Sequence, residues 1–204
     1  DPHYTGRATV PVLWDKKTRT IVNNESADIL RMLNDGFGNL ADNGVDLYPE
    51  ALRNEIDALN DHIYPRLNNG VYRTGFATTQ GAYEEAFADV FATLQELENR
   101  LLSGGPFLFG HQLTETDVRL FVTLVRFDAA YYGLFKCNLR RIADYPALQA
   151  YMMRVLDIPG VRETVNIDHI KRGYYSIKAL NPTRIVPVGP DLPGLDDVAS
   201  GWAG

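Results

Sequence analysis

From Pro49 onward the apolar residues recur every three or four positions, and this spacing predicts an all-helical domain. The first helix is expected to open at Pro49, because proline suits the first turn of a helix. Its apolar stripe consists of Leu52, Ile56, Leu59 and Ile63. The run Asn68-Asn69-Gly70 is expected to end it. A second long helix is expected over residues 80–102, before the stop at 103–106.

A third helix is expected to begin at Thr114. Thr114 and Asp117 have the spacing at which a hydroxyl and a carboxylate cap backbone N–H groups reciprocally. The run 118–125 is apolar apart from Arg119 and Thr123, so this helix should be enclosed on most sides. Another helix is expected over 144–155 and one or two short ones over 161–175. Residues 176–204, rich in Pro and Gly, are expected to form an extended tail.

The beginning of the chain has a different pattern. Residues 8–15 are apolar and β-branched, 16–19 form a polar turn, and 20–22 read as a second strand. A helix should follow from residues 24–26, and a polar linker over 36–48. Because two strands cannot stand alone, we expect a partial α/β portion at 1–40 and an all-helical domain at 49–204. The fold class is therefore mainly α.

Composition excludes several functions. The 204 residues carry a net charge of -6 without a dense basic cluster, so no nucleic-acid partner is expected. No apolar run is long enough for a membrane helix, and no signal peptide is visible. The single cysteine fits a reducing cytoplasm. The four histidines are scattered, so no metal site is expected. Small molecules or a second copy of the chain are the expected partners.

Val10-Pro11 is the first motif that bears on binding. A proline at the start of a strand belongs on an edge or at a bend, because it cannot donate to the sheet. If the Val10–Pro11 bond is cis, the backbone of Val10 turns outward and offers its N–H and C=O groups to a peptide ligand. The alternative is a trans proline on an edge strand, which is the commoner case.

Glu25 and Ser26 form the second motif, at the expected start of a helix. The free N–H groups of a helix N-terminus can bind a carboxylate. Ser26 would add a hydroxyl donor, and Glu25 would accept from an ammonium group, so the pair suits an α-amino acid end. The alternative is a simple N-cap by Asn24 or Ser26. For a peptide ligand, Val10 and Ser26 must share one cleft.

Taken together, Val10-Pro11, the hairpin, Glu25-Ser26 and the capping box resemble a glutathione transferase, and specifically the glutathionyl-hydroquinone reductases of the Xi class. The resemblance runs from residue 1 to about 190. It is carried by DPHYTGR (1–7), VPVLWDKK (10–17), NESA (24–27), NNGVYRTGFA (68–77), DHIKRGYY (168–175) and NPT (181–183). It implies a partial thioredoxin-like portion before the helical domain, a cis Val10–Pro11 bond, and a homodimer.

The resemblance also implies a reaction. A low-pKa cysteine would take glutathione from a glutathionyl-hydroquinone as a mixed disulfide, and a second glutathione would resolve it. Glutathione is then the co-substrate, held at Val10, Pro11, Glu25 and Ser26, and aromatic quinols are the substrates. The family's cysteine stands in a Cys-Pro-Trp motif that would lie before Asp1, so we expect a truncated and inactive chain.

Cys137, with Lys136 beside it to lower its pKa slightly, is the weaker alternative for the nucleophile; a buried structural thiol is the expected role. Two further functions remain open. One is a binding or assembly module with the transferase fold and no chemistry. The other is a conventional transferase that conjugates glutathione to electrophiles.

Tyr72 and Tyr174 resemble the family's pair that lines the hydroquinone pocket and acts on the leaving quinol. A phenol offers an O–H donor on a rigid ring. The alternative for each is a buried core tyrosine. Tyr64 and Tyr175 are weaker candidates for the same wall. Gly173 stands where the family has a histidine, and we expect it to loosen a turn before Tyr174.

Overall fold

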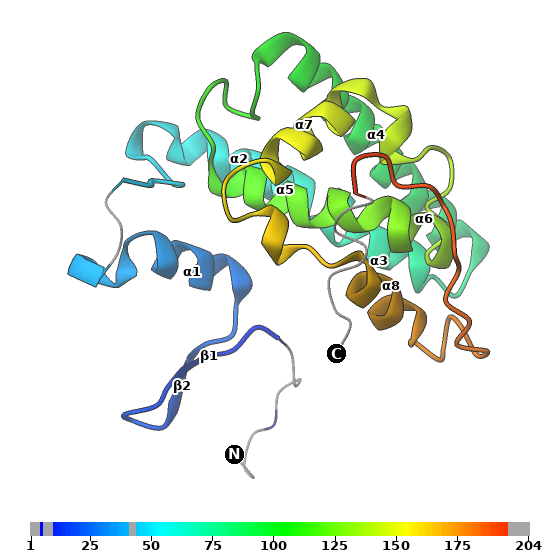
Figure 1. Cartoon of the computed structure of the whole chain (residues 1–204), viewed down its shortest axis with the longest axis horizontal. Helices are drawn as coiled ribbons and strands as arrows, with labels where there is room; N and C mark the ends of the chain where they lie inside the picture. The colour runs from blue at the N-terminus through cyan, green and yellow to red at the C-terminus, as the bar shows by residue number, and fades with distance from the viewer. Residues whose placement is uncertain (1–4, 6–9, 41–43, 196–204) are drawn as a thin grey trace. The chain divides into compact units, whose positions relative to one another are not determined.

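The computed structural model describes residue 5, residues 10–40 and residues 44–195. The chain divides into two compact units, residues 1–53 and residues 54–204 (Figure 1). The described part is mostly helical, with one two-stranded sheet near the N-terminus. This confirms the expected mainly α fold class. Within the described residues, no helix is both long and apolar enough to span a membrane.

The first unit contains the expected hairpin. Strands β1 (Leu13–Asp15) and β2 (Thr20–Asn23) are antiparallel, with Trp14 opposite Ile21 and an irregularity between Leu13 and Trp14. The carboxylate of Asp15 closes the turn by accepting from the backbone N–H groups of Lys17 at 2.7 Å and of the next residue. The first strand is shorter than expected, beginning at Leu13. The expected strand residues 8 and 9 lie outside the described residues.

Helix α1 (Ser26–Arg31) follows the hairpin and continues as a π-helical segment, η1 (Met32–Gly36), and a short 3₁₀ turn, η2 (Gly38–Leu40). Asn24 and Ser26 were the expected N-cap residues, but the N-cap is Glu25. The Glu25 carboxylate takes this role because it accepts from the N–H of Ala27. Part of the expected linker folds back on this segment: Asn34 accepts from the N–H of Leu47 at 2.7 Å.

The 3₁₀ turn η3 (Glu50–Leu52) leads into α2 (Arg53–Ile63), the π-helical segment η4 (Tyr64–Asn68) and α3 (Gly70–Gly75). The expected helix end at residues 68–70 is confirmed, since η4 ends at Asn68, but a new helix, α3, begins directly afterwards at Gly70 and was not expected. The reason is tertiary. The Asn68 side chain binds α5 through the carbonyl of Arg119, and Gly70 allows close approach to Val90, 3.1 Å from where a Cβ would lie.

Helices α4 (Gln80–Gly104) and α5 (Glu115–Arg126) form the centre of the second unit with α7 (Pro146–Leu156). The expected capping box at the start of α5 is confirmed. The Asp117 carboxylate accepts from the N–H of Thr114 at 2.8 Å, and also from Leu108 and Tyr151. Through Leu108 these bonds hold the loop that precedes α5, and through Tyr151 they hold α7, against the start of α5.

After α5 the helix does not stop. It passes into a π-helical segment, η5 (Phe127–Tyr131), and then α6 (Tyr132–Leu134). This continuation was not predicted from the sequence. A 3₁₀ turn, η6 (Ile142–Asp144), precedes α7, whose first N–H groups are capped by Glu98 of α4. The chain continues through η7 (Arg162–Thr164) into α8 (Ile167–Tyr175).

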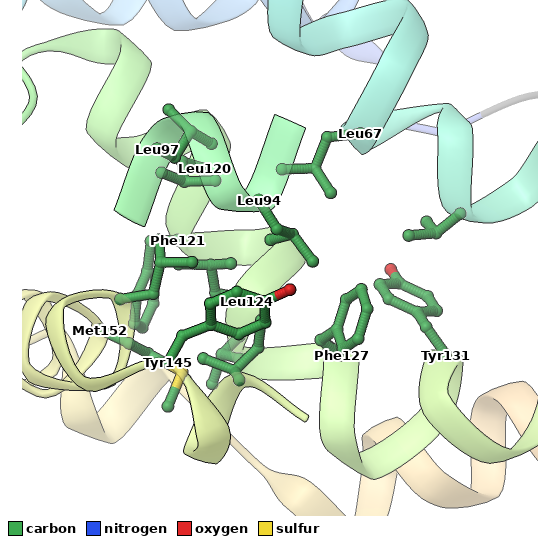
Figure 2. Packing of buried hydrophobic residues seen from close by; sticks show 14 of the residues in the cluster. Leu67, Leu94, Leu97, Leu120, Phe121, Leu124, Phe127, Tyr131, Tyr145 and Met152 are labelled. Atoms are coloured by element: carbon green, nitrogen blue, oxygen red, sulfur yellow. The ribbon is translucent and has the colours of Figure 1, made fainter. Parts of the chain in front are cut away.

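The tail from residue 176 to 195 is anchored on α8. The ammonium of Lys171 donates to the carbonyls of Pro187, Val188 and Gly189, the shortest distance being 2.7 Å. The hydrophobic core of the second unit lies among α4, α5, α7 and η5 (Figure 2). In Figure 2, Phe127 and Tyr131 lie next to each other, and their rings meet edge to face at 6.2 Å. This packing positions Tyr131 for the site described next.

Candidate functional site

Three tyrosine hydroxyls meet in the second unit. The hydroxyl of Tyr174, on α8, lies 2.6 Å from that of Tyr72, on α3, and 2.8 Å from that of Tyr131, on η5. The Tyr72 and Tyr131 hydroxyls are 3.4 Å apart. We call these three residues the phenol cluster. The structure thus brings together the two tyrosines selected from the sequence and adds a third.

The three members differ in exposure. Tyr131 is 2% exposed, Tyr174 is half-buried, and Tyr72 is 36% exposed. A hydroxyl donates one proton and accepts others. When Tyr72 donates outward to a ligand, Tyr174 can donate to Tyr72, and Tyr131 to Tyr174. Because hydrogen bonds in such a chain polarise one another, the outermost donor is strengthened.

Burial keeps the inner phenols protonated. It raises the pKa of Tyr174 to about 12. Burial also raises the pKa of Tyr131 above its usual range, and the neighbouring phenols Tyr174 and Tyr72 add to the shift. At neutral pH, Tyr131 and Tyr174 are therefore hydrogen-bond donors rather than bases.

Phe135 supports the cluster from one side. Its ring stacks on Tyr131 with centroids 5.2 Å apart and an interplanar angle of 18°. It lies 5.3 Å from the ring of Tyr72 and 5.8 Å from that of Tyr174. Gly75 makes room for it, since a Cβ there would lie 2.5 Å from Cδ1 of Phe135. A buried aromatic thus touches all three phenols.

Sequence reasoning missed Tyr131. The signal was present in Phe127, Tyr131 and Phe135, which stand four positions apart and continue the helical period beyond Arg126. No helix was expected between residues 126 and 143, so this signal was not used.

The other tyrosine candidates lie apart from this arrangement. Tyr64, on η4, is 59% exposed, and its side chain makes no hydrogen bond to a described residue. The Tyr175 hydroxyl lies over Gly133, 2.7 Å from where a Cβ would be. Gly173 does not loosen a turn, contrary to expectation. It lies inside α8, where backbone hydrogen bonds hold it in the helix.

The candidate glutathione residues lie in the first unit. The Val10–Pro11 bond is cis, so the trans alternative is wrong. Val10 is 91% exposed. The Glu25 carboxylate accepts from the Ser26 hydroxyl at 3.5 Å and from the N–H of Ala27 at 3.4 Å. Both distances are long, so the carboxylate keeps most of its capacity to accept from a ligand.

Cys137 is a structural thiol, as expected. It is fully buried, and burial raises its pKa to about 12. The suggested lowering by Lys136 is wrong, because desolvation dominates. Among the described residues, no three His, Cys, Asp or Glu side chains form a group that could hold a metal ion.

Comparison with known proteins finds relatives of this chain. Residues 80–154 match the family model described as "Glutathione S-transferase, C-terminal domain". The chain is 52% identical to glutathione transferase Xi 1 from Trametes versicolor, with a TM-score of 0.89, over 93% of this chain and 67% of that one. This chain belongs to the Xi-class glutathione transferases.

Two further relatives of this Xi-class chain are a protein named as a reductase and a solved glutathione complex. It is 55% identical to "Glutathionyl-hydroquinone reductase PcpF" of Sphingobium chlorophenolicum, over 96% of this chain and 63% of that protein. The glutathione-bound structure of YqjG from Escherichia coli K-12 matches with a TM-score of 0.91 and 53% identity, over 94% of this chain and 62% of that one. The chain therefore spans less than two thirds of the length of these relatives.

Proposed function

We propose that this Xi-class protein reduces glutathionyl-hydroquinones to hydroquinones, with glutathione as the co-substrate. The observation that carries the proposal is the phenol cluster, in which three hydroxyls lie within 3.4 Å of one another and one of them, Tyr72, is open to solvent. The names of the relatives support the choice of reaction.

In the proposed reaction, a thiolate attacks the sulfur of the glutathionyl-hydroquinone. An S–S bond forms as the bond between sulfur and the ring carbon breaks. For the charge to reach an oxygen, the conjugate reacts as its keto tautomer, in which the proton of a neighbouring hydroxyl has moved to the carbon that carries sulfur. The electron pair of the broken C–S bond then forms an enolate with its charge on the quinol oxygen, which takes up a proton to give the hydroquinone. A second thiolate, from glutathione, then releases glutathione disulfide. One conjugate and one glutathione thus give one hydroquinone and one disulfide.

The phenol cluster stabilises the charge that develops in this step. Negative charge on the quinol oxygen strengthens a hydrogen bond from Tyr72 or Tyr174, and the buried Tyr131 donates from behind. Fixed donors aimed at a developing oxyanion typically contribute about 10²–10³ in rate. The raised pKa of Tyr174 supports this role, because the phenol stays protonated at working pH.

Glutathione is proposed to bind the first unit. Glu25 would accept from the ammonium of the γ-glutamyl group, Ser26 would donate to its carboxylate, and the backbone of Val10 with Pro11 would pair with the peptide. The exposed position of Val10 and the weakly engaged Glu25 carboxylate support this assignment.

The attacking thiolate is not proposed to be Cys137. A fully buried thiol with a pKa of about 12 carries almost no thiolate at neutral pH. Cys137 is the one cysteine of this sequence, so the reaction needs a thiol that the sequence does not contain. Reduction of a glutathionyl-hydroquinone by purified chain 1–204 alone would therefore contradict this assignment.

The test is a kinetic comparison of the wild-type enzyme with a variant of the phenol cluster. Tyr174→Phe should lower kcat about 10- to 100-fold with a small change in KM, because the lost donor acts mainly as charge builds. Unchanged kcat would remove Tyr174 from the mechanism. A chloronitrobenzene measured in parallel separates reduction from conjugation. Turnover of neither substrate would favour a binding module without chemistry.

Glutathione binding is tested separately. Glu25→Ala should weaken the affinity for glutathione about tenfold, as expected for loss of a charged hydrogen bond. Asp35→Ala, which removes another exposed carboxylate from the same helical segment, is the matched control and should bind normally. Equal affinity in wild type and Glu25→Ala would refute the assignment.

A homodimer and a cytoplasmic location complete the proposal. The family resemblance supports the dimer, and the single buried thiol is compatible with a reducing compartment. Light scattering should give twice the chain mass.

A further inference from the structure

A pocket of about 370 Å³ opens beside Tyr174 in the second unit. Its lining combines two aliphatic side chains, the phenol, two basic side chains and a glycine: Arg126, His169, Ile170, Gly173, Tyr174 and Ile177. Small-molecule pockets usually measure about 300–1,000 Å³. The space thus suits a substituted aromatic ring but is small for a whole glutathione conjugate.

Gly173 leaves this space open. A Cβ at this position would meet no heavy atom within 4 Å. Residues 170, 173, 174 and 177 fall on one face of a helical path, because they are spaced three, one and three positions apart. The aliphatic side chains of Ile170 and Ile177 therefore flank the gap at Gly173 and give the pocket apolar walls.

Arg126 gives the pocket a positive charge. It is the last residue of α5, and its Nη1 donates to the carbonyl of Val122. Within the described residues this is its one side-chain hydrogen bond, and a guanidinium has five N–H donors. None of the six lining residues is acidic. The charge of Arg126 also acts on Tyr174, where it lowers the phenol pKa against the larger effect of burial.

We propose that this pocket holds a ring substituent of the quinol and that Arg126 selects substrates in which the substituent carries a carboxylate. The inference rests on the proposed function: Tyr174 faces the quinol oxygen, and the substituent extends along α8 to the guanidinium. A planar guanidinium pairs with a carboxylate through two parallel hydrogen bonds. Arg126 is then a specificity-determining residue, and the substrate class is a glutathionyl-hydroquinone with an acidic side chain.

The experiment compares two conjugates as substrates of the enzyme, one with a carboxymethyl group on the quinol ring and one with the uncharged carboxamide of the same shape. Wild type should favour the carboxylate about tenfold or more in kcat/KM. Arg126→Gln should abolish this preference. Arg172→Gln is the matched control, because Arg172 is an exposed cation of α8 that pairs with Asp168 outside the pocket. It should keep the preference.

A second variant tests the pocket itself. In Gly173→Leu the added Cβ would meet no heavy atom within 4 Å, and leucine favours the helix, so we expect the variant to fold with its side chain in the open space. It should raise KM for both substituted conjugates more than for the unsubstituted one. No preference in wild type, or an unchanged preference in Arg126→Gln, would overturn the inference.

Binding measurements separate this inference from the proposed function. If the enzyme reduces neither conjugate, the proposed function fails. Calorimetric titration with 2,5-dihydroxyphenylacetate and its amide then still measures how tightly the pocket binds each compound. Tighter binding of the acid that disappears in Arg126→Gln supports the inference, and equal binding of acid and amide overturns it.

Discussion

Gly75 lies so close to Phe135 that a Cβ atom there would stand 2.5 Å from Cδ1 and 2.8 Å from Cβ of the phenylalanine. This approach allows the ring to contact all three phenols of the cluster. We predict that Gly75→Ala destabilises the protein by about 1–3 kcal/mol, as overpacking usually does, and lowers kcat by displacing the phenols. Urea unfolding and steady-state kinetics measure the two effects.

Gly81 provides the control for that substitution. It lies in the first turn of α4, and a Cβ atom there would have no heavy atom within 4 Å. Gly81→Ala should stabilise the protein by about 0.5–1 kcal/mol through helix propensity alone. Equal behaviour of the two variants would show that Phe135 moves away easily.

Tyr131→Phe removes the innermost donor of the cluster and leaves the ring. In the enzyme we predict a kcat about tenfold lower, because the donor behind Tyr174 is lost, and a stability loss of about 1 kcal/mol. Tyr64→Phe is the control, since Tyr64 is exposed and lies outside the cluster. If Tyr131→Phe keeps full kcat, the buried phenol has no part in the reaction.

Alkaline pH should destabilise the fold through the phenols. The pKa of Tyr174 is about 12 in the folded protein and about 10 when unfolded. The unfolded chain therefore releases the proton first, and the free energy of unfolding should fall as pH rises from 10 to 12. Chemical unfolding at several pH values measures the slope. Tyr174→Phe should show a smaller slope, and an identical slope would contradict the prediction.

Cys137 should resist thiol reagents while the protein is folded. A pKa near 12 leaves about 10⁻⁴ of the thiol ionised at pH 8, compared with about a quarter for a free cysteine. An aromatic disulfide reagent should react about 10³-fold more slowly than in denaturant. Rapid native reaction would show that the thiol is accessible.

Glu98 should be the most sensitive carboxylate of α4. It accepts from the N–H groups of Ala147 at 2.9 Å and Leu148 at 2.7 Å. Glu98→Ala leaves the buried N–H of Leu148 and the half-buried N–H of Ala147 without their partner, and we predict a loss of about 2–4 kcal/mol. Glu96→Ala, which removes an exposed partner of His62, should lose less than about 1 kcal/mol. Urea unfolding of both variants decides.

Features that depend on neighbouring residues could be predicted from the sequence. The hairpin and the capping box of Thr114 and Asp117 each lie within a few positions, and both are confirmed. The helix end expected at Asn68-Asn69-Gly70 is confirmed, but the immediate start of α3 was not predicted, because it accompanies a bond from the Asn68 side chain to α5, 51 positions away. Turn residues indicate where a helix can end, whereas tertiary contacts decide whether another helix begins there.

The candidate site could be predicted only in part. Tyr72 and Tyr174 were selected through a family resemblance, since no spacing rule connects residues 102 positions apart. Tyr131 was not predicted because it lies on a π-helical segment after α5 that has no side-chain N-cap. The pocket beside Arg126 exists because Gly173 has no side chain, and the sequence alone could not show that the space next to this glycine is open.

The grip of Lys171 on the carbonyls of residues 187–189 links the tail to the helix that carries Tyr174, three positions further along. Burial lowers the pKa of this amine, which marks it as partly withdrawn from water. Acetylation of Lys171, or proteolysis between residues 180 and 187, would remove or detach this tether. Damage to the tail would thus reach the end of α8 that carries Tyr174.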